Sequence, residues 1–262
     1  IVGDAAAEYL GALRIYGRGL IGGDVPSMEL LHPMEKHLEC VSCFLNDPTQ
    51  VLMPAVRRMK ADFVVLEENG SADFNPAAGR EALEKEGISV KILDVRGSTE
   101  SVLRRAGKLF GEEKQAERII RERTERLAAL DDVRKSIRKG QKAAIFLAIR
   151  SPVRHESYVF RISERSALSQ LLTNTFAIEN INVRPNAEER IPGIQELDDL
   201  SDLFEKNPDL IVYTGDAAAC GQKITEFIRK HPQFAECNAV KNGRIYGAPY
   251  YCHALDLRRH EI

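Results

Sequence analysis

Residues 112–139 have the sequence EEKQAERIIRERTERLAALDDVRKSIRK, which contains neither glycine nor proline. Its apolar residues recur at the spacing of one helix face: Ala116, Ile119, Ile120, Leu127, Leu130, Val133 and Ile137. The pattern predicts a single uninterrupted helix that ends at Gly140 and, at 1.5 Å per residue, is roughly 40 Å long. We interpret this segment as a helix that connects two lobes. The alternative is a long surface helix that packs on one domain.

Short apolar runs alternate with amphipathic stretches on the amino-terminal side of this helix. The apolar runs predict strands, which are residues 1–3, 19–23, 62–66 and 88–95. The stretches between them predict helices, which are residues 4–13, 54–60, 77–86 and 98–111. A new strand-helix pattern begins at residues 143–149. This order favours an α/β fold class, with two Rossmann-like lobes of mostly parallel sheets joined by one long α-helix.

The two halves also contain similar short sequences. KADFVV at residues 60–65 is echoed by KNPDLIV at residues 206–212, and an amphipathic stretch precedes each. One match is weak evidence for a repeat. Combined with the helix between the copies, it favours an amino-terminal lobe over residues 1–111, a connecting helix over residues 112–139 and a carboxyl-terminal lobe over residues 140–262.

The composition excludes several classes of protein. The chain of 262 residues carries 37 Lys and Arg against 39 Asp and Glu, for a formal net charge of −2, so we expect no nucleic-acid partner. A hydrophobic content of 44% is too high for a disordered chain. The longest apolar stretches, such as residues 143–149, fall far short of the roughly 20 residues that span a bilayer.

One glycine motif matches the dinucleotide-binding pattern G-x-G-x-x-G, at Gly17, Gly19 and Gly22. That site needs a strand before the glycines and a helix after them. Here the predicted helix comes first, and the predicted strand lies inside the motif. We therefore expect these glycines to serve turn geometry, and we expect no cofactor.

The cysteines leave three interpretations open. Cys40 and Cys43 have the spacing of a metal or redox pair, and His32 and His37 lie shortly upstream. A structural zinc site needs a second ligand pair, whereas the other three cysteines are scattered along the chain. The pair can be structural thiols near a short strand, a disulfide or metal ligands.

Polar and aromatic residues follow several predicted strands. Ligands of open α/β sheets bind outside the carboxyl ends of strands, so these residues are the candidate ligand-binding set. They are Asp24, Glu68 and Asn69 from the first half, and Arg150, Arg154, His155, Tyr158, Tyr250, Tyr251 and His253 from the second. Tyr, His and Arg can bind iron, stack on a flat chromophore or pair with carboxylates. The alternative is a solvated loop with scattered aromatic residues.

The chain resembles the single-helix-hinged solute-binding proteins of ABC importers, which capture siderophores, haem, cobalamin or related metal complexes. The resemblance covers essentially the whole chain and rests on the order of several short segments. These are IVG at 1–3, EYLGAL at 8–13, LIG at 20–22, MKADFVV at 59–65, LEKEGISV at 83–90, STE at 98–100, NPDLIV at 207–212 and AVKNGRIY at 239–246. No catalytic motif such as a nucleophile elbow or a P-loop is present.

The resemblance implies a non-catalytic, extracytoplasmic protein, in the periplasm or lipid-anchored to the outer face of the cell membrane. It implies a monomer that holds an iron complex, a siderophore or haem, between two lobes and feeds an ABC permease. A cobalamin or oxyanion ligand is the nearest alternative. A tetrapyrrole-handling enzyme, by fold analogy alone, and a ligand sensor are others.

Two departures from the family bear on partners and ligand. Members usually carry a Glu on each lobe that docks onto permease Arg residues. In this sequence Pro54 stands where the docking Glu of the first lobe is expected. The docking Glu of the second lobe is expected near Ser201, where Asp199 and Asp202 are the candidate substitutes for it. The chain also has no Trp, so Tyr would have to stack on the ligand.

Overall fold

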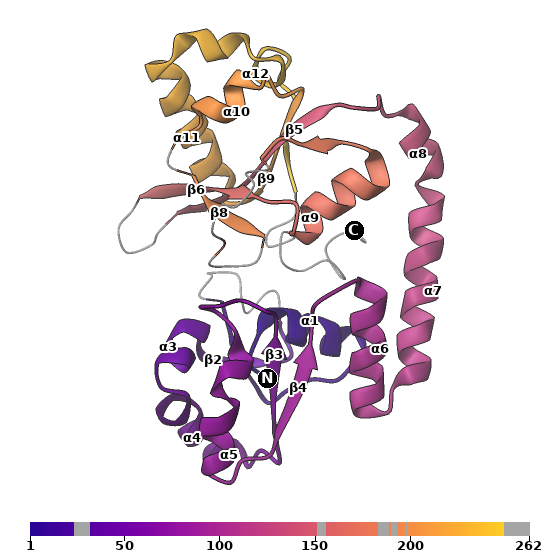
Figure 1. The fold of residues 1–262 in the computed structure, drawn as a ribbon, viewed down its shortest axis with the longest axis vertical. Coiled ribbons are helices and arrows are strands. Elements are labelled where there is room, and N and C mark those ends of the chain that lie inside the picture. Colours follow the sequence, from indigo (N-terminus) through magenta and orange to yellow (C-terminus); the bar gives the residue numbers. More distant parts are fainter. Residues whose placement is uncertain (24–31, 151–155, 183–188, 190–192, 198, 249–262) are drawn as a thin grey trace. The chain divides into compact units, whose positions relative to one another are not determined.

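The computed structural model describes residues 1–23, 32–150, 156–182, 189, 193–197 and 199–248, with the backbone alone at position 196. The chain divides into two compact units, one formed by Ile1–Arg126 and one that begins at Leu127. We call them the amino-terminal and carboxyl-terminal units (Figure 1). The division falls within a helix, so the predicted lobe boundaries at residues 111 and 140 stay a prediction.

The segment expected to be one helix over residues 112–139 is interrupted. Helix α7 covers Glu113–Ala129 and helix α8 covers Asp131–Ser136. Leu130 between them has φ −82° and ψ 0°, and its N–H donates to Leu127 O in a tighter, three-residue turn. The prediction of an uninterrupted helix is therefore wrong. Aspartates favour a helix start over a helix interior, and Asp131 and Asp132 occupy the first turn of α8.

The sheet of the amino-terminal unit is entirely parallel in its described pairs. Its strands are β1 Gly19–Gly22, β2 Lys36–Cys40, β3 Val64–Glu68 and β4 Val90–Asp94. Strand β1 pairs with β2, and β3 pairs with β4. Val2 bridges the two pairs through Ile21 and Leu66. The predicted strand at residues 1–3 is thus reduced to one bridging residue.

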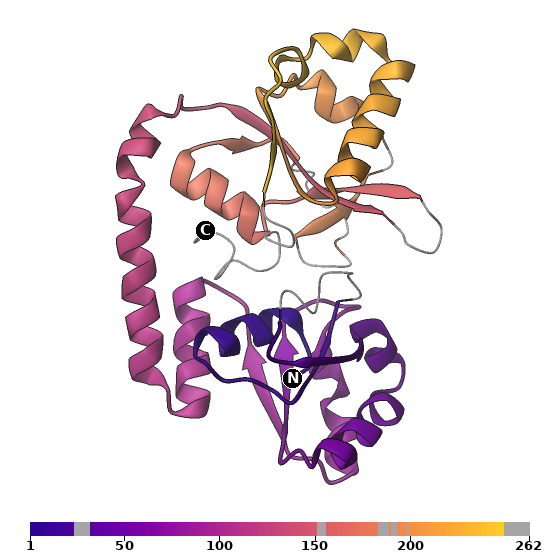
Figure 2. The same cartoon turned by 180° about the vertical axis from the view of Figure 1, so that it is seen from behind.

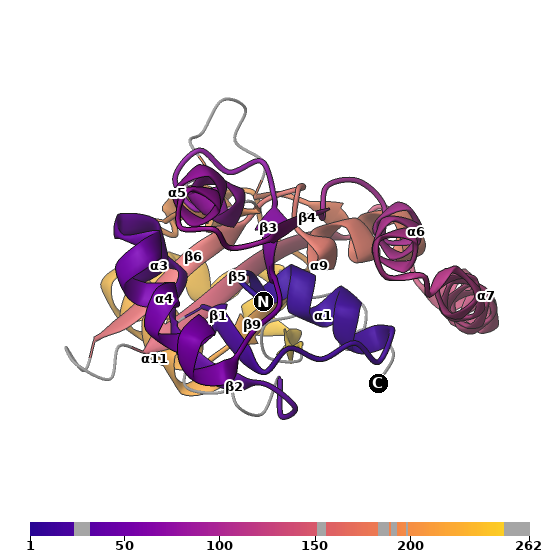
Figure 3. The same cartoon turned by 90° about the horizontal axis from the view of Figure 1, so that it is seen from below.

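Helices cover both faces of this sheet. They are α1 Asp4–Ala12, α3 Val41–Asn46, α4 Pro48–Met59, the 3-10 helix η1 Pro76–Gly79, α5 Arg80–Lys85 and α6 Thr99–Phe110. Helices α3, α4 and α5 lie on one side of the strands, and α1 and α6 lie on the other (Figure 3). Val64 and Leu66 pack with Phe44 of α3 and Leu52 of α4 on the first side.

The carboxyl-terminal unit has a mixed sheet with a parallel centre. Its strands are β5 Lys142–Arg150, β6 Ser157–Ile162, β7 Glu179–Asn180, β8 Ile194–Glu196, β9 Leu210–Gly215 and β10 Ile245–Gly247. Their order is β10-β9-β5-β6-β8, with β7 beside the start of β5. Strands β7, β9 and β10 join in parallel, whereas β6 and β8 are antiparallel.

Two layers of helix enclose this sheet as well. They are α9 Ala167–Gln170, the π-helix η2 Leu171–Thr175, α10 Ser201–Glu205, α11 Ala217–Lys230, the 3-10 helix η3 Pro232–Glu236 and α12 Asn238–Lys241. Phe146 packs with the α10, α11 and α12 side, and its neighbours Ile145 and Leu147 pack with the α9 side (Figure 2). The predicted α/β fold class is confirmed. Among the residues that the structure describes, every helix is too short or too polar to span a bilayer.

Candidate functional site

Parallel pairing brings the carboxyl ends of strands to one edge of the amino-terminal unit. In the β3–β4 register Glu67 lies opposite Leu93, and Glu68 lies opposite Asp94. Cys40 ends β2 at the same edge, opposite Gly22 of β1. Acidic groups and a thiol therefore share the edge where open α/β sheets bind ligands.

Glu68, a predicted ligand residue, is engaged by its own loop. Asn75 donates through Nδ2 to both carboxylate oxygens of Glu68, at 2.9 and 3.0 Å. The Gly70 N–H donates to Glu68 Oε1 at 2.9 Å. The carboxylate thus holds residues 70 and 75 beside the end of β3, and its side chain keeps 23% exposure.

The side chain of Asn69 has a similar structural role. Its Nδ2 donates to Glu67 Oε1 and to Phe74 O, both at 2.9 Å, and its Oδ1 accepts from Ser71 N at 2.9 Å. Both amide hydrogens and the oxygen therefore have partners inside the unit. This residue organises the loop that follows β3.

Glu67 lies buried under the start of α1. Its Oε2 accepts from Ala6 N at 3.0 Å. Burial raises the pKa of this carboxyl, and the hydrogen bonds from Ala6 and Asn69 offset part of the effect. A Cβ at Gly3 would come 2.4 Å from Glu67 Cβ, so the glycine lets the carboxylate reach the helix.

Arg96 is an edge residue that the sequence analysis missed. Its guanidinium binds Asp94 through Nε and Nη2 at 2.9 and 3.0 Å, and its side chain is 57% exposed. The hydrogen bonds from Arg96 lower the pKa of Asp94 to about 2. The sequence did contain a signal for this residue, because Arg96 directly follows the predicted strand at residues 88–95 and polar residues after strands were the candidates.

Cys40 and Cys43 are both free thiols, and their Sγ atoms lie 3.1 Å apart. Cys43 is exposed at the surface of α3. The hydrogen bond between the two thiols is the main cause that raises the pKa of Cys43 to about 11, because it favours the protonated form of Cys43. The disulfide that the sequence left open is not formed in this structure.

In the carboxyl-terminal unit, the structure describes two of the predicted ligand residues. They lie at the same end of the β5–β6 pair but on opposite faces of the sheet, because Arg150 lies opposite Ser157 and Tyr158 lies opposite Ile149. Arg150 ends β5, is exposed and pairs in register with Ser157 of β6. Tyr158 is half-buried in β6, and its hydroxyl donates to the carboxylate of Glu156. A strand-to-helix connection was expected after residue 149, but β5 pairs antiparallel with β6 instead.

Six predicted ligand residues lie outside the described part of the chain. They are Asp24, Arg154, His155, Tyr250, Tyr251 and His253. The structure thus describes Glu68 and Asn69 in one unit and Arg150 and Tyr158 in the other.

The three positions considered for permease docking differ in their surroundings. Pro54 is exposed inside α4. Asp199 is exposed and accepts from Ser201 N at 3.1 Å and from Ser201 Oγ at 3.0 Å, and these bonds lower its pKa. Asp202 instead accepts from Arg161 Nη2 at 2.8 and 2.9 Å, and the Arg161 side chain is fully buried.

The glycine motif does not form the turn that was expected. Gly19 and Gly22 are the ends of strand β1 itself. A Cβ at Gly19 would lie 2.6 Å from Leu38 Cδ1. Gly19 therefore permits close packing of Leu38, and the predicted turn role is wrong for these two glycines.

This chain was compared with models of protein families and with curated protein sequences. A family model described as periplasmic binding protein matches residues 45–251. A search of curated protein sequences gave no match.

Several solved structures have a similar fold. SirA of Staphylococcus aureus superposes with a TM-score of 0.67 at 13% identity, over 99% of this chain and 93% of SirA. A periplasmic haem-binding protein of Pseudomonas aeruginosa superposes with a TM-score of 0.63 at 14% identity, over 95% of this chain and 83% of that protein. The iron-uptake system-binding protein FeuA of Bacillus subtilis superposes with a TM-score of 0.62 at 18% identity, over 93% of this chain and 81% of FeuA.

Proposed function

Because the chain belongs to the periplasmic binding protein family, we propose that it captures an iron complex, a siderophore or haem, and delivers it to an ABC importer. The proposed location is extracytoplasmic, in the periplasm or on the outer face of the cell membrane through a lipid anchor. The proposed protein acts as a monomer and binds its ligand without chemical turnover.

The exposed position of Arg150 at the end of β5 is the observation that carries this proposal, and Tyr158 on the other face of the β5–β6 pair is a second candidate contact. The two residues lie at the joined end of β5 and β6, inside the region that the family model matches. An exposed guanidinium pairs with the carboxylates or oxyanions of an iron complex, and a phenol is a suitable iron ligand. The folds shared with a haem-binding protein and with an iron-uptake protein support the ligand class.

The remaining predicted residues take two proposed roles. Arg154, His155, Tyr250, Tyr251, His253 and Asp24 are proposed to contact the ligand. Glu68 and Asn69 are proposed to act through the loop that follows β3, since their side-chain hydrogen bonds go to that loop and strand, and Glu68 Oε1 also lies 4.0 Å from Arg96 Nη1. Arg96 joins the ligand-binding proposal as an exposed cation at that edge.

Asp199 is the better of the two proposed docking acids. Asp202 forms an ion pair with a buried arginine, and a permease that drew Asp202 away would break that buried pair. Asp199 is exposed and its accepted hydrogen bonds keep it ionised. Asp199→Arg should reduce stimulation of the importer's ATPase while the affinity for the ligand stays unchanged.

A ligand screen tests the proposal. The chain has seven Tyr and no Trp, so its intrinsic fluorescence reports on Tyr. Ferric siderophores and haem should quench it at low concentration, whereas cobalamin and an oxyanion such as molybdate should not. Binding of cobalamin or the oxyanion alone would replace the proposed ligand class. Turnover of a tetrapyrrole would instead support the enzyme alternative.

A further inference from the structure

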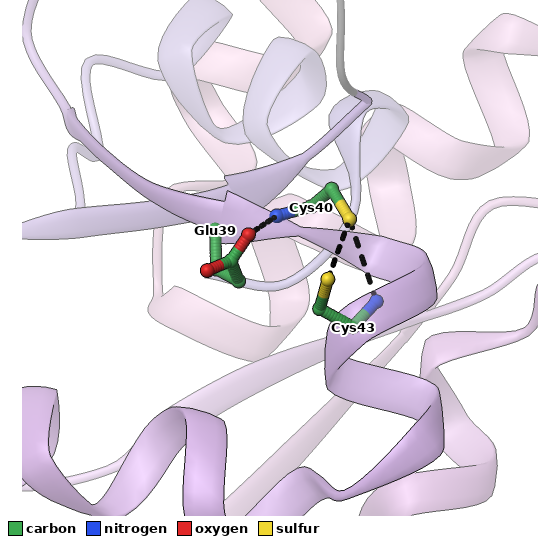
Figure 4. A group of neighbouring side chains, drawn as sticks. All are labelled: Glu39, Cys40 and Cys43. Atoms are coloured by element: carbon green, nitrogen blue, oxygen red, sulfur yellow. Dashed lines mark hydrogen bonds between the residues drawn. The ribbon is translucent and has the colours of Figure 1, made fainter.

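A cluster of three metal-binding side chains lies at the end of β2 and the start of α3. Glu39, Cys40 and Cys43 each offer one ligand atom, and these atoms all lie within 4.8 Å of one another (Figure 4). All three residues belong to the amino-terminal unit. None of them is among the residues proposed to bind the iron complex, although Cys40 ends β2 at the same sheet edge as Glu68.

We propose that Glu39, Cys40 and Cys43 bind a thiophilic divalent cation of the Zn²⁺ and Cd²⁺ class. Thiolate sulfur selects these soft or borderline ions over Mg²⁺ and Ca²⁺, which need oxygen ligands. The carboxylate supplies a third donor and leaves a fourth position for water. Both thiols release a proton when the ion binds, so binding should acidify an unbuffered solution.

The separations of the donor atoms suit one tetrahedral ion. With Zn–S bonds of about 2.3 Å, two sulfurs on the same Zn²⁺ lie about 3.8 Å apart. The sulfurs are 3.1 Å apart in the structure, so they need to separate by less than about 1 Å. Cys43 is exposed, so a side-chain rotation can supply that movement without disturbing the core.

Backbone hydrogen bonds already hold the donors in place. The N–H of Cys40 donates to Glu39 Oε1 at 3.0 Å, which keeps the carboxylate beside the first thiol. The N–H of Cys43 donates to Cys40 Sγ at 3.4 Å. A site whose ligands are held before binding loses less conformational freedom when the ion arrives.

A disulfide between the two cysteines is the competing outcome. It requires the sulfurs to close to about 2.05 Å, again a movement of about 1 Å. The nearby carboxylate favours the metal, because it adds a third ligand to a cation and contributes nothing to a disulfide. Reducing conditions separate the two chemistries.

The test is a Zn²⁺ titration of the reduced chain against a chromophoric chelator, with Cd²⁺ titrated separately to observe the ultraviolet thiolate-to-cadmium band. We expect one ion per chain and a cadmium band in wild type. The Cys40→Ser/Cys43→Ser double variant should lose both signals. Glu39→Gln removes a direct ligand and should weaken Zn²⁺ binding by at least about 10- to 100-fold, the loss found when even an outer partner of a metal ligand is removed.

Two matched controls should leave the site intact. Cys220→Ala removes a thiol that is 1% exposed in the core of the other unit, and Glu86→Gln removes an exposed carboxylate. Unchanged Zn²⁺ affinity in the double cysteine variant would overturn the proposal. So would a reduced wild type that fails to compete with the chelator, or a Cys40–Cys43 disulfide that forms on removal of the reductant at the same rate with and without saturating Zn²⁺.

Discussion

Arg161, whose side chain is completely buried in the carboxyl-terminal unit, donates from Nη2 to both carboxylate oxygens of Asp202, at 2.8 and 2.9 Å. Arg161 Nη1 also donates to Asn182 O at 3.3 Å. The pair connects β6 to α10 and allows a charge to lie within the unit. An arginine buried this deeply requires such a partner.

Removal of Asp202 should destabilise the protein far more than removal of Asp199. Loss of one partner from a buried ion pair costs about 3–5 kcal/mol, and we expect Asp202→Ala near the lower end because this carboxylate is 35% exposed. Asp199→Ala removes an exposed acceptor of Ser201 and should cost about 0.5–1.5 kcal/mol. Urea unfolding of both variants measures the difference. Equal losses would contradict the assigned roles.

Glu67 should make the stability fall as the pH rises. Its pKa is raised in the folded state, so the folded chain holds the proton more tightly than the unfolded chain. The stabilisation is complete below the ordinary pKa of 4.5 and is lost as the pH rises through the folded-state value. Glu67→Gln should therefore gain stability relative to wild type with increasing pH. Denaturant unfolding from pH 4 to 8 measures this, with Glu86→Gln as the control. The same pH dependence of the free energy of unfolding in both variants would contradict the prediction.

Gly215 should tolerate no side chain. Its φ is +91°, and a Cβ would lie 2.1 Å from Ala148 O. The strained backbone alone costs about 1–3 kcal/mol in a non-glycine residue, so Gly215→Ala should lower stability by at least that amount. Gly221 lies in α11 with open space around it, so Gly221→Ala should be neutral or stabilise by about 0.5–1 kcal/mol. Thermal unfolding of the pair checks both signs.

Asn69 should matter for stability because its amide makes three hydrogen bonds in the loop after β3. Asn69→Ala leaves their partners to find water or remain unpaired, which should cost about 1–3 kcal/mol. Hydrogen exchange should show faster exchange of the Ser71 N–H in this variant. Unchanged stability and unchanged exchange would contradict the structural role of Asn69 and leave only the proposal that it contacts the ligand directly.

The sequence predicted those elements whose ends carry their own chemical signals. The helix at residues 98–111 has Ser98 as its cap and Gly111, with φ 74°, at its end. Helix α4 was predicted too short because Pro54 lies inside it, although Asp47 caps its true start. Strand β2 was missed because its residues are mostly exposed or half-buried and form no apolar run.

The candidate site was harder to predict than the fold. Strand ends gave the right edge for Glu68, yet the sequence could not show that Asn75, seven residues on, occupies both of its oxygens. That contact depends on the path of the loop. The break at Leu130 had a signal in Asp131 and Asp132, but helical periodicity continued through it and hid the interruption.

Affinity for a ferric siderophore or haem in wild type, Arg150→Ala and Arg229→Ala tests the proposed function most directly. Both substitutions remove an exposed arginine from the carboxyl-terminal unit, but only Arg150 lies at the end of β5. A charge-assisted contact is worth about 1.5–3 kcal/mol, so Arg150→Ala should weaken binding roughly 10- to 150-fold. Arg229→Ala should bind like wild type. A wild-type chain that binds no iron complex would contradict the proposed function, and equal affinity in all three would contradict the assigned site.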